Sequence, residues 1–163
     1  SKYTDVNLKN FSQVWVHEKG MPYLYFAQKG NVLEINQIDP YKRGFLWPQS
    51  FKVHLCGTEN AILDISLVDT LTRIELPFIP ERILPNIDGR GYGLFVPDAK
   101  SLAWILENWH TIEDDTERLS ILMLLYENYL AGNIVDYDWM HSLFDGIALE
   151  KNPLIASAIV SYF

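Results

Sequence analysis

The sequence predicts an α+β protein, in which an antiparallel β-sandwich precedes a bundle of paired antiparallel α-helices. Two changes along the chain carry this prediction. Up to Pro97, apolar residues alternate with polar ones in short segments about ten residues apart, as in half-buried strands. After Pro97, apolar residues recur with the spacing of an amphipathic helix. Between the two patterns lies the segment 84–96, whose glycines at positions 89, 91 and 93 suit a turn that needs positive φ.

The strands are expected from period-two alternation and from turn residues. Segments 22–28 and 32–38 flank Lys29-Gly30-Asn31, a hairpin turn. Further strands are expected over 51–56, 63–68 and 72–76, and the last strand over 92–96. Segment 78–84 lies among three prolines, which cannot donate to a ladder, so we expect an edge strand or an irregular crossing there. This regular succession is typical of an immunoglobulin-like or fibronectin-like sandwich.

Five helices are expected from capping signals and apolar faces. The first, near the N-terminus, begins at Asp5 and carries Leu8, Phe11, Val14 and Trp15. Asp98 caps the second, which has Leu102, Ile105, Leu106 and Trp109 on one face, and the third runs from Asp115 to Leu130. The fourth is expected to be capped by Asp136 and to bury Met140, Leu143, Phe144 and Ile147. Asn152 and Pro153 begin the fifth, with Ile155, Ala158, Ile159 and Tyr162 on one face.

Composition limits the classes of function. The 163 residues are 48% hydrophobic and 13% aromatic, which favours a folded core over disorder. The net charge is −8 and no basic cluster exceeds Lys42-Arg43, so nucleic-acid binding is not expected. No apolar run approaches the ~18 residues of a membrane span. The single cysteine, Cys56, excludes an internal disulfide and favours a structural thiol over a nucleophile.

Three motifs invite a chemical interpretation, and none predicts a site. His17-Glu18 begins like the zinc-binding HExxH motif, but the second histidine position is Met21, so the end of a surface helix is favoured. The glycine segment 89–93 resembles a phosphate-binding loop but leads into a strand, so a turn is favoured. Glu113, Asp114, Asp115 and Glu117 could hold calcium, although acidic residues at a helix start need no metal.

The remaining candidates are dispersed along the chain. His54, His110 and His141 have no partner at a recognisable spacing. Trp47, Trp104, Trp109 and Trp139 could form a sugar-stacking platform but fit core positions better. Asn10-Phe11-Ser12 is a glycosylation sequon, meaningful only in a eukaryotic secretory setting. We therefore predict no catalytic, cofactor-binding or metal-binding residue in this chain.

Several motifs follow one another along the chain: Phe11…Trp15…Gly20-Met21-Pro22, then Leu46-Trp47-Pro48, then Leu84-Pro85-Asn86…Gly91-Tyr92-Gly93, followed by paired helices. Their order resembles the C-terminal part of the aminopeptidase N family of zinc metallopeptidases. The resemblance implies that residues 1–20 are the tail of a catalytic domain, 21–97 a β-sandwich and 98–163 the truncated start of a helical domain. It also implies that Pro97-Asp98 marks the change from strand to helix, with Tyr92 packed near that joint.

The same resemblance implies a noncatalytic role. The family's HExxH motif, its substrate-amine site and its transition-state tyrosine do not occur in this sequence, so the chain is expected to be inactive and zinc-free by itself. Its implied partners are the catalytic and remaining helical parts of a parent aminopeptidase, which binds zinc and removes N-terminal residues from peptides. The abrupt helical pattern at Tyr162-Phe163 also suggests a piece of a longer protein. The alternative is a noncatalytic β-sandwich module that binds glycan or protein ligands.

Overall fold

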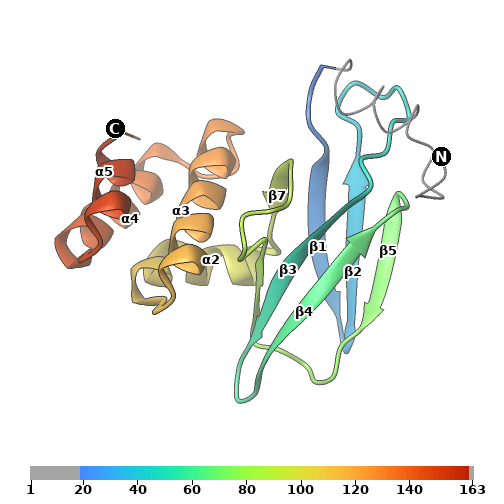
Figure 1. Cartoon of the computed structure of the whole chain (residues 1–163), viewed down its shortest axis with the longest axis horizontal. Helices are drawn as coiled ribbons and strands as arrows, with labels where there is room; N and C mark the ends of the chain where they lie inside the picture. The colour runs from blue at the N-terminus through green and yellow to red at the C-terminus, as the bar shows by residue number, and fades with distance from the viewer. Residues whose placement is uncertain (1–18, 162–163) are drawn as a thin grey trace, which may run out of the picture.

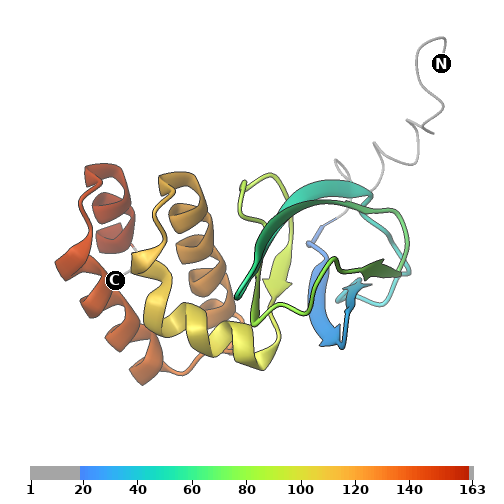
Figure 2. The same cartoon turned by 90° about the horizontal axis from the view of Figure 1, so that it is seen from below.

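The computed structural model describes residues 19–161, and the protein is a mixed α+β fold with strands first and helices after them. The helix expected from Asp5, the pair His17-Glu18 and the sequon at Asn10 lie outside the described residues. Figure 1 shows the strands and the helices as two adjoining parts of the molecule, and Figure 2 shows the same division from below.

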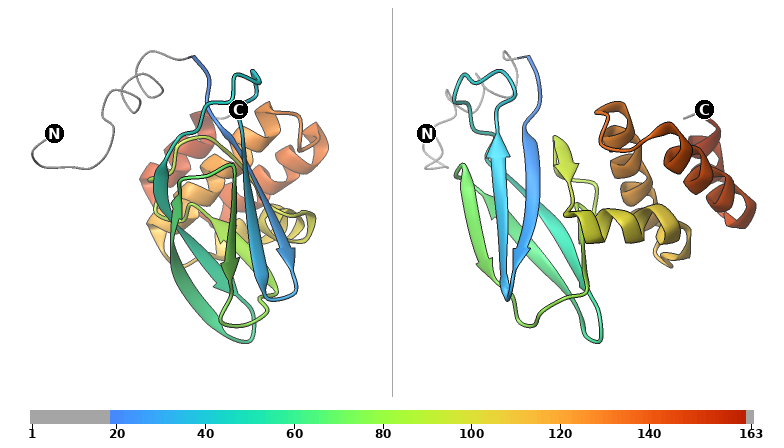
Figure 3. Two further views of the ribbon diagram at one scale, coloured as in Figure 1. Left: turned by 90° about the vertical axis from the view of Figure 1, so that its right-hand side faces the viewer. Right: turned by 180° about the vertical axis from the view of Figure 1, so that it is seen from behind.

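Seven strands form two sheets in the described part of the chain. The strands are β1 (Tyr23–Lys29), β2 (Val32–Ile38), β3 (Gln49–Cys56), β4 (Asn60–Leu67), β5 (Leu71–Glu75), β6 (Arg82–Pro85) and β7 (Leu94–Val96). One sheet has the order β5-β2-β1-β7 and the other the order β4-β3-β6. The two sheets form separate layers, which are clearest from the side and from behind (Figure 3). We call residues 21–97 the two-sheet unit.

The hairpin, the edge strand and the strand alternation are confirmed, but one pairing differs from the prediction. Gly30-Asn31 turns between β1 and β2, and β6, with its proline, lies at the edge of its sheet. The prediction of purely antiparallel strands is wrong for β7, which pairs in parallel with β1, Tyr23 opposite Leu94. The chain crosses through β6 in the other sheet before it returns, so β7 arrives by a long crossover and not by a hairpin.

Aromatic side chains pack between the sheets. Phe26 on β1 and Phe95 on β7 both lie against Phe51 on β3, with ring centroids 6.2 and 4.9 Å from that of Phe51. All three rings are buried. Phe51 comes from the opposite sheet, so these contacts hold the two sheets together. The edge-to-face geometry adds stabilisation beyond that from the burial of apolar area.

Four α-helices and one short 3-10 helix follow in the described residues. They are α2 (Ala99–Asn108), η2 (Trp109–Thr111), α3 (Asp115–Leu130), α4 (Asp136–Leu149) and α5 (Pro153–Ser161). The change from strand to helix at Pro97-Asp98 is confirmed, as are the bounds of α3 and the start of α5. The Asn152 side chain accepts from the Leu154 N–H at 2.9 Å, as an N-cap should.

The prediction for α4 is wrong in two respects. Its N-cap is Val135, without a side-chain cap bond, and Asp136 is the first helical residue. Met140 and Phe144 are exposed, whereas Trp139, Ser142, Leu143 and Gly146 are the buried residues. The helix has large apolar residues on two sides, so the spacing alone does not distinguish them. The small residues Ser142 and Gly146 decide the matter, because they allow the buried indole of Trp109 to approach.

Candidate functional site: the junction of the sheets and the helices

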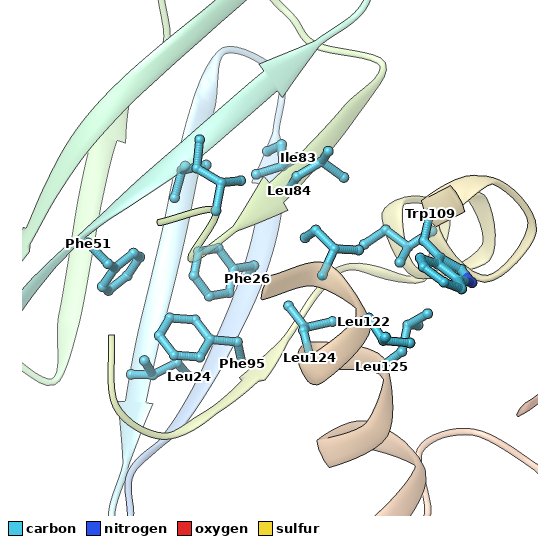
Figure 4. Packing of buried hydrophobic residues seen from close by; sticks show 14 of the residues in the cluster. Leu24, Phe26, Phe51, Ile83, Leu84, Phe95, Trp109, Leu122, Leu124 and Leu125 are labelled. Carbon is cyan, nitrogen blue, oxygen red and sulfur yellow. The ribbon is translucent and has the colours of Figure 1, made fainter. Parts of the chain in front are cut away.

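A continuous apolar core connects the two-sheet unit with the helices. Figure 4 shows the side chains of this core running from Leu24 and Phe51 between the sheets to Leu122, Leu125 and Trp109 among the helices. The same buried cluster extends through Leu143 to Ile155 and Ile159. We call the contact region between the two-sheet unit and the helices α2 and α3 the junction.

The loop before β7 is closed by its own hydrogen bonds. Asn86 adopts a positive φ of 55°, and its Oδ1 accepts from the Gly91 N–H at 2.7 Å. The Gly89 N–H donates to the Asn86 carbonyl, and the Tyr92 N–H donates to Gln49 Oε1 at 2.7 Å. Because these N–H groups have partners within the chain, they do not form a phosphate cradle. The loop is a turn, as the sequence favours.

Two glycines in this loop are required by close packing. A Cβ on Gly91 would lie 2.4 Å from the ring of Phe95, and one on Gly93 would lie 2.5 Å from the carbonyl oxygen of Pro22. Gly93 also has a φ of 134°, which L side chains rarely adopt. Tyr92 is 45% exposed, and its hydroxyl donates to the Gly20 carbonyl at 3.4 Å. Its packing near Pro97-Asp98 stays a prediction.

Asp98 and Ser101 connect the start of α2 to β6. Asp98 accepts from the N–H groups of Lys100 and Ser101, as predicted for an N-cap, and also from the Ser101 hydroxyl at 2.7 Å. The Ser101 Oγ in turn accepts from the Ile83 N–H at 2.9 Å. Ser101 is buried, so this relay both caps the helix and satisfies a strand N–H that faces it.

Asn128 makes the corresponding connection from α3. It is fully buried, and its Nδ2 donates to the Phe95 carbonyl of β7 and to the Leu124 carbonyl, both at 2.8 Å. Its Oδ1 accepts from Asn133 at 2.9 Å. A buried amide with its donor and acceptor groups satisfied fixes the helix against the strand in one arrangement.

Two further side-chain contacts border the junction. His54 Nδ1 on β3 lies 2.7 Å from Glu117 Oε1 on α3, and both residues are largely buried. The guanidinium of Arg82 on β6 lies over the Trp104 ring of α2, 4.2 Å from its centroid. Together with Ser101 and Asn128, these residues join β3, β6 and β7 to α2 and α3.

The acidic residues considered as calcium ligands have different hydrogen-bond partners in the structure. Asp114 caps α3 by accepting from the Glu117 N–H, while Glu117 points to His54. Asp115 accepts from Arg118 and Asn152. Within residues 19–161, no three His, Cys, Asp or Glu side chains gather closely enough to hold a metal ion. These acids therefore act as helix cap and ion-pair partners.

Arg118 forms a polar cluster at the start of α3. Its guanidinium donates to both carboxylate oxygens of Glu150, at 2.8 and 3.0 Å, and to the carbonyls of Ile112 and Glu113. The Glu150 side chain is 1% exposed. Burial acts to raise the pKa of Glu150, but hydrogen bonds from Arg118 and the backbone outweigh it, so this pKa is lowered overall. A hollow of about 540 Å³ borders this cluster and is also lined by His110.

The tryptophan candidates do not form a surface platform. Trp47, Trp109 and Trp139 are each at most 1% exposed, and Arg82 covers the ring of Trp104. The Trp47 N–H donates to Gln37 Oε1 at 2.6 Å inside the two-sheet unit. These residues belong to the core, which is the interpretation that the apolar sequence pattern favours.

Cys56 is a buried thiol, and the effect of burial on its pKa outweighs the attraction of Arg82 for a thiolate. It lies at the end of β3, is 4% exposed, and has a pKa raised to about 11, chiefly by burial. We expect no reaction with Ellman's reagent at pH 8 within minutes for the folded protein, and complete reaction after unfolding in guanidinium chloride. Rapid labelling of the folded protein would contradict a purely structural thiol.

Sequence reasoning missed the residues that organise these contacts. Ser101, Asn128 and Arg118 lie within helices, where the sequence offers no sign of a partner. The available signal was an Asn or Arg on the apolar side of a predicted helix, since a buried polar residue needs a partner.

A scan against protein-family models and a search of curated proteins both returned no match to this chain. Among the described residues, no helix is long and apolar enough to cross a membrane.

Proposed function

We propose that this chain is a noncatalytic scaffold of a zinc aminopeptidase. In this proposal, the two-sheet unit is an immunoglobulin-like or fibronectin-like sandwich, and the helices begin a paired antiparallel array. The catalytic part of the parent enzyme binds zinc and removes N-terminal residues from peptides. This chain keeps that part in a fixed position relative to the helical part that encloses the substrate.

The observation that carries the proposal is the rigid junction. Its core is continuous from the sheets to the helices, and two buried polar groups, Ser101 and Asn128, bridge it. Buried polar contacts of this kind specify one arrangement and are costly to leave unsatisfied. Such a junction supports the proposal that the segment holds the parts on either side of it in fixed positions. The resemblance of Trp47-Pro48 and Asn86…Gly91-Tyr92 to the aminopeptidase N family supports the choice of parent.

The alternative, a binding module for glycan or protein ligands, loses its strongest feature. Trp47, Trp109 and Trp139 are three of the four tryptophans considered as a sugar-stacking platform, and each is at most 1% exposed. Exposed aromatic residues such as Tyr41 and Tyr137 lie far apart in the sequence, one before β3 and the other on α4. The scaffold is therefore the function that the described residues support better.

A rigid scaffold predicts a single cooperative unfolding transition. Calorimetry should give a ratio of calorimetric to van't Hoff enthalpy near about 1, with coincident near-UV and far-UV circular dichroism transitions. Asn128→Ala should lower the free energy of unfolding by about 1–3 kcal/mol, because it leaves the Phe95 carbonyl without its donor. The whole transition should shift without splitting. Two separate transitions in the unaltered protein would contradict a rigid junction.

The enzymatic part of the proposal has its own test. The chain alone should contain no stoichiometric zinc and should not hydrolyse aminoacyl chromogenic substrates above the buffer rate. Zinc at one equivalent together with turnover would refute a noncatalytic role. The coding sequence upstream of Ser1 should encode an HExxH motif and a further glutamate, as a zinc site with a general base requires. An unrelated complete domain there would overturn the aminopeptidase assignment.

A further inference from the structure

An acidic hollow lies between α2 and α4, away from the junction. It has a volume of about 340 Å³ and is lined by Ala103, Leu106 and Glu107 of α2 and by Tyr137, Asp138, His141, Ser142 and Asp145 of α4. Three carboxylates line it, and its lining includes no lysine or arginine. The residues of α4 follow a helical spacing, so they present one face of that helix to α2.

The polar groups of this hollow are incompletely paired. Asp145 lies 3.1 Å from His141 Nδ1, but neither Glu107 nor Asp138 forms an ion pair among the described residues. Ser142 is 3% exposed, and its hydroxyl has no hydrogen-bond partner. A buried hydroxyl without a partner is costly, so a ligand that supplies one gains binding free energy. The hollow thus combines unpaired negative charge with an unsatisfied buried group.

We propose that this hollow binds the guanidinium group of an arginine side chain from a partner polypeptide. The chemistry of the lining selects this occupant. Within residues 19–161, these acids do not come together as ligands of one metal ion. A cation that contacts them together therefore needs several N–H donors that are separated in space. A guanidinium has five N–H donors in a plane and can contact carboxylates of two helices together, whereas an ammonium is a compact point charge.

Size and aromatic contact favour the same group. The hollow is at the small end of the ~300–1,000 Å³ typical of ligand sites, which suits one side chain better than a larger molecule. Tyr137 lines the hollow and is 76% exposed, and the centroid of its ring lies 6.0 Å from that of His141. An exposed ring beside carboxylates provides a face on which a guanidinium stacks. The negative charge of the chain as a whole also attracts a basic partner.

The test is a titration of the ¹⁵N-labelled chain with N-acetyl-arginine methylamide, followed by backbone amide shifts. We expect saturable shifts confined to segments 103–107 and 137–145, with a Kd of about 1–10 mM that weakens as salt is added. The citrulline analogue, which is neutral and has the same shape, should not bind. The lysine analogue should bind more weakly. Equal binding of citrulline, equal binding of lysine, or no saturation would overturn the proposal.

Three variants separate charge from shape. Glu107→Gln combined with Asp138→Asn should weaken binding at least about tenfold. Ala103→Leu keeps every charge and narrows the hollow, so it should also weaken binding. Glu59→Gln removes one exposed carboxylate from the turn between β3 and β4 and should leave the Kd unchanged. Since all the altered residues are exposed, the variants should stay folded, as checked by thermal unfolding. Equal weakening by Glu59→Gln would reveal nonspecific attraction and contradict the proposal.

Discussion

Arg118→Met should lower the free energy of unfolding by about 3–5 kcal/mol, the largest effect expected of any single substitution considered. The methionine retains most of the apolar stem but removes the guanidinium. Glu150 is then left as a buried carboxylate, 1% exposed, without its cation. The carbonyls of Ile112 and Glu113 also lose their donor. Chemical denaturation at pH 7 measures the change.

Two controls identify the uncompensated charge as the cause. Asp115→Asn alters the partner of Arg118 that is 59% exposed, and it should cost far less stability than Arg118→Met because solvent screens this contact. Glu150→Gln in the Arg118→Met background removes the buried charge and should restore part of the loss. A loss in the double variant as large as in Arg118→Met would show that the charge is not the cause.

The same variant has a predictable pH dependence. In the unaltered protein the pKa of Glu150 is lower than in the unfolded chain. Ionised Glu150 therefore stabilises the folded state above the unfolded-chain pKa, and this stabilisation is lost as the pH falls through the pKa of the folded state. Without Arg118, burial raises this pKa instead, and protonation of Glu150 relieves the destabilisation. The difference in stability between the two proteins should therefore shrink as the pH falls below about 5. A difference independent of pH would contradict the ion-pair explanation.

Gly146→Ala should destabilise the protein by about 2 kcal/mol, although the same substitution in an exposed helix stabilises by about 1 kcal/mol. A Cβ at this position would lie 1.9 Å from Cζ2 of Trp109. The indole is fully buried, and its Nε1 donates to the Ser142 carbonyl at 3.3 Å. It cannot move away without loss of packing on both α2 and α4. A fall in Tm of about 4–8 °C is expected.

A double-mutant cycle tests the steric cause. Trp109→Leu opens space above Gly146 and is itself expected to be destabilising, because it removes a buried aromatic ring. In that background, Gly146→Ala should be neutral or stabilising, since only its helix propensity remains. An unchanged cost of Gly146→Ala in the leucine background would show that Trp109 is not the obstacle.

These two positions explain how the helices are held together. Arg118 joins the start of α3 to the segment between α4 and α5, while Gly146 allows the end of α2 to pack on α4 through Trp109. The junction then fixes α2 and α3 to the two-sheet unit through Ser101 and Asn128. The proposed scaffold role requires such contacts at each step, because one loose connection would release the parts on either side of it.

Local sequence features determined the kinds of element and most of their bounds. The alternation in 51–56 identifies β3, Asp98 identifies the start of α2, and Pro153 identifies the first turn of α5. These features act within a few residues, through side-chain alternation, hydrogen bonds to the nearest N–H groups and the fixed φ of proline. They are therefore readable without knowledge of the rest of the chain.

Only the tertiary structure decided how distant elements meet. The parallel pairing of β7 with β1, the buried face of α4 and the pairing of Arg118 with Glu150 across 32 residues all depend on which surface a neighbour presents. In α4, Met140 and Phe144 are as apolar as the residues that are buried, so the choice of face depends on the position of Trp109. The sequence by itself thus determined an α+β order with capped helices, and long-range packing determined the junction and the acidic hollow, because contact free energies depend on both partners.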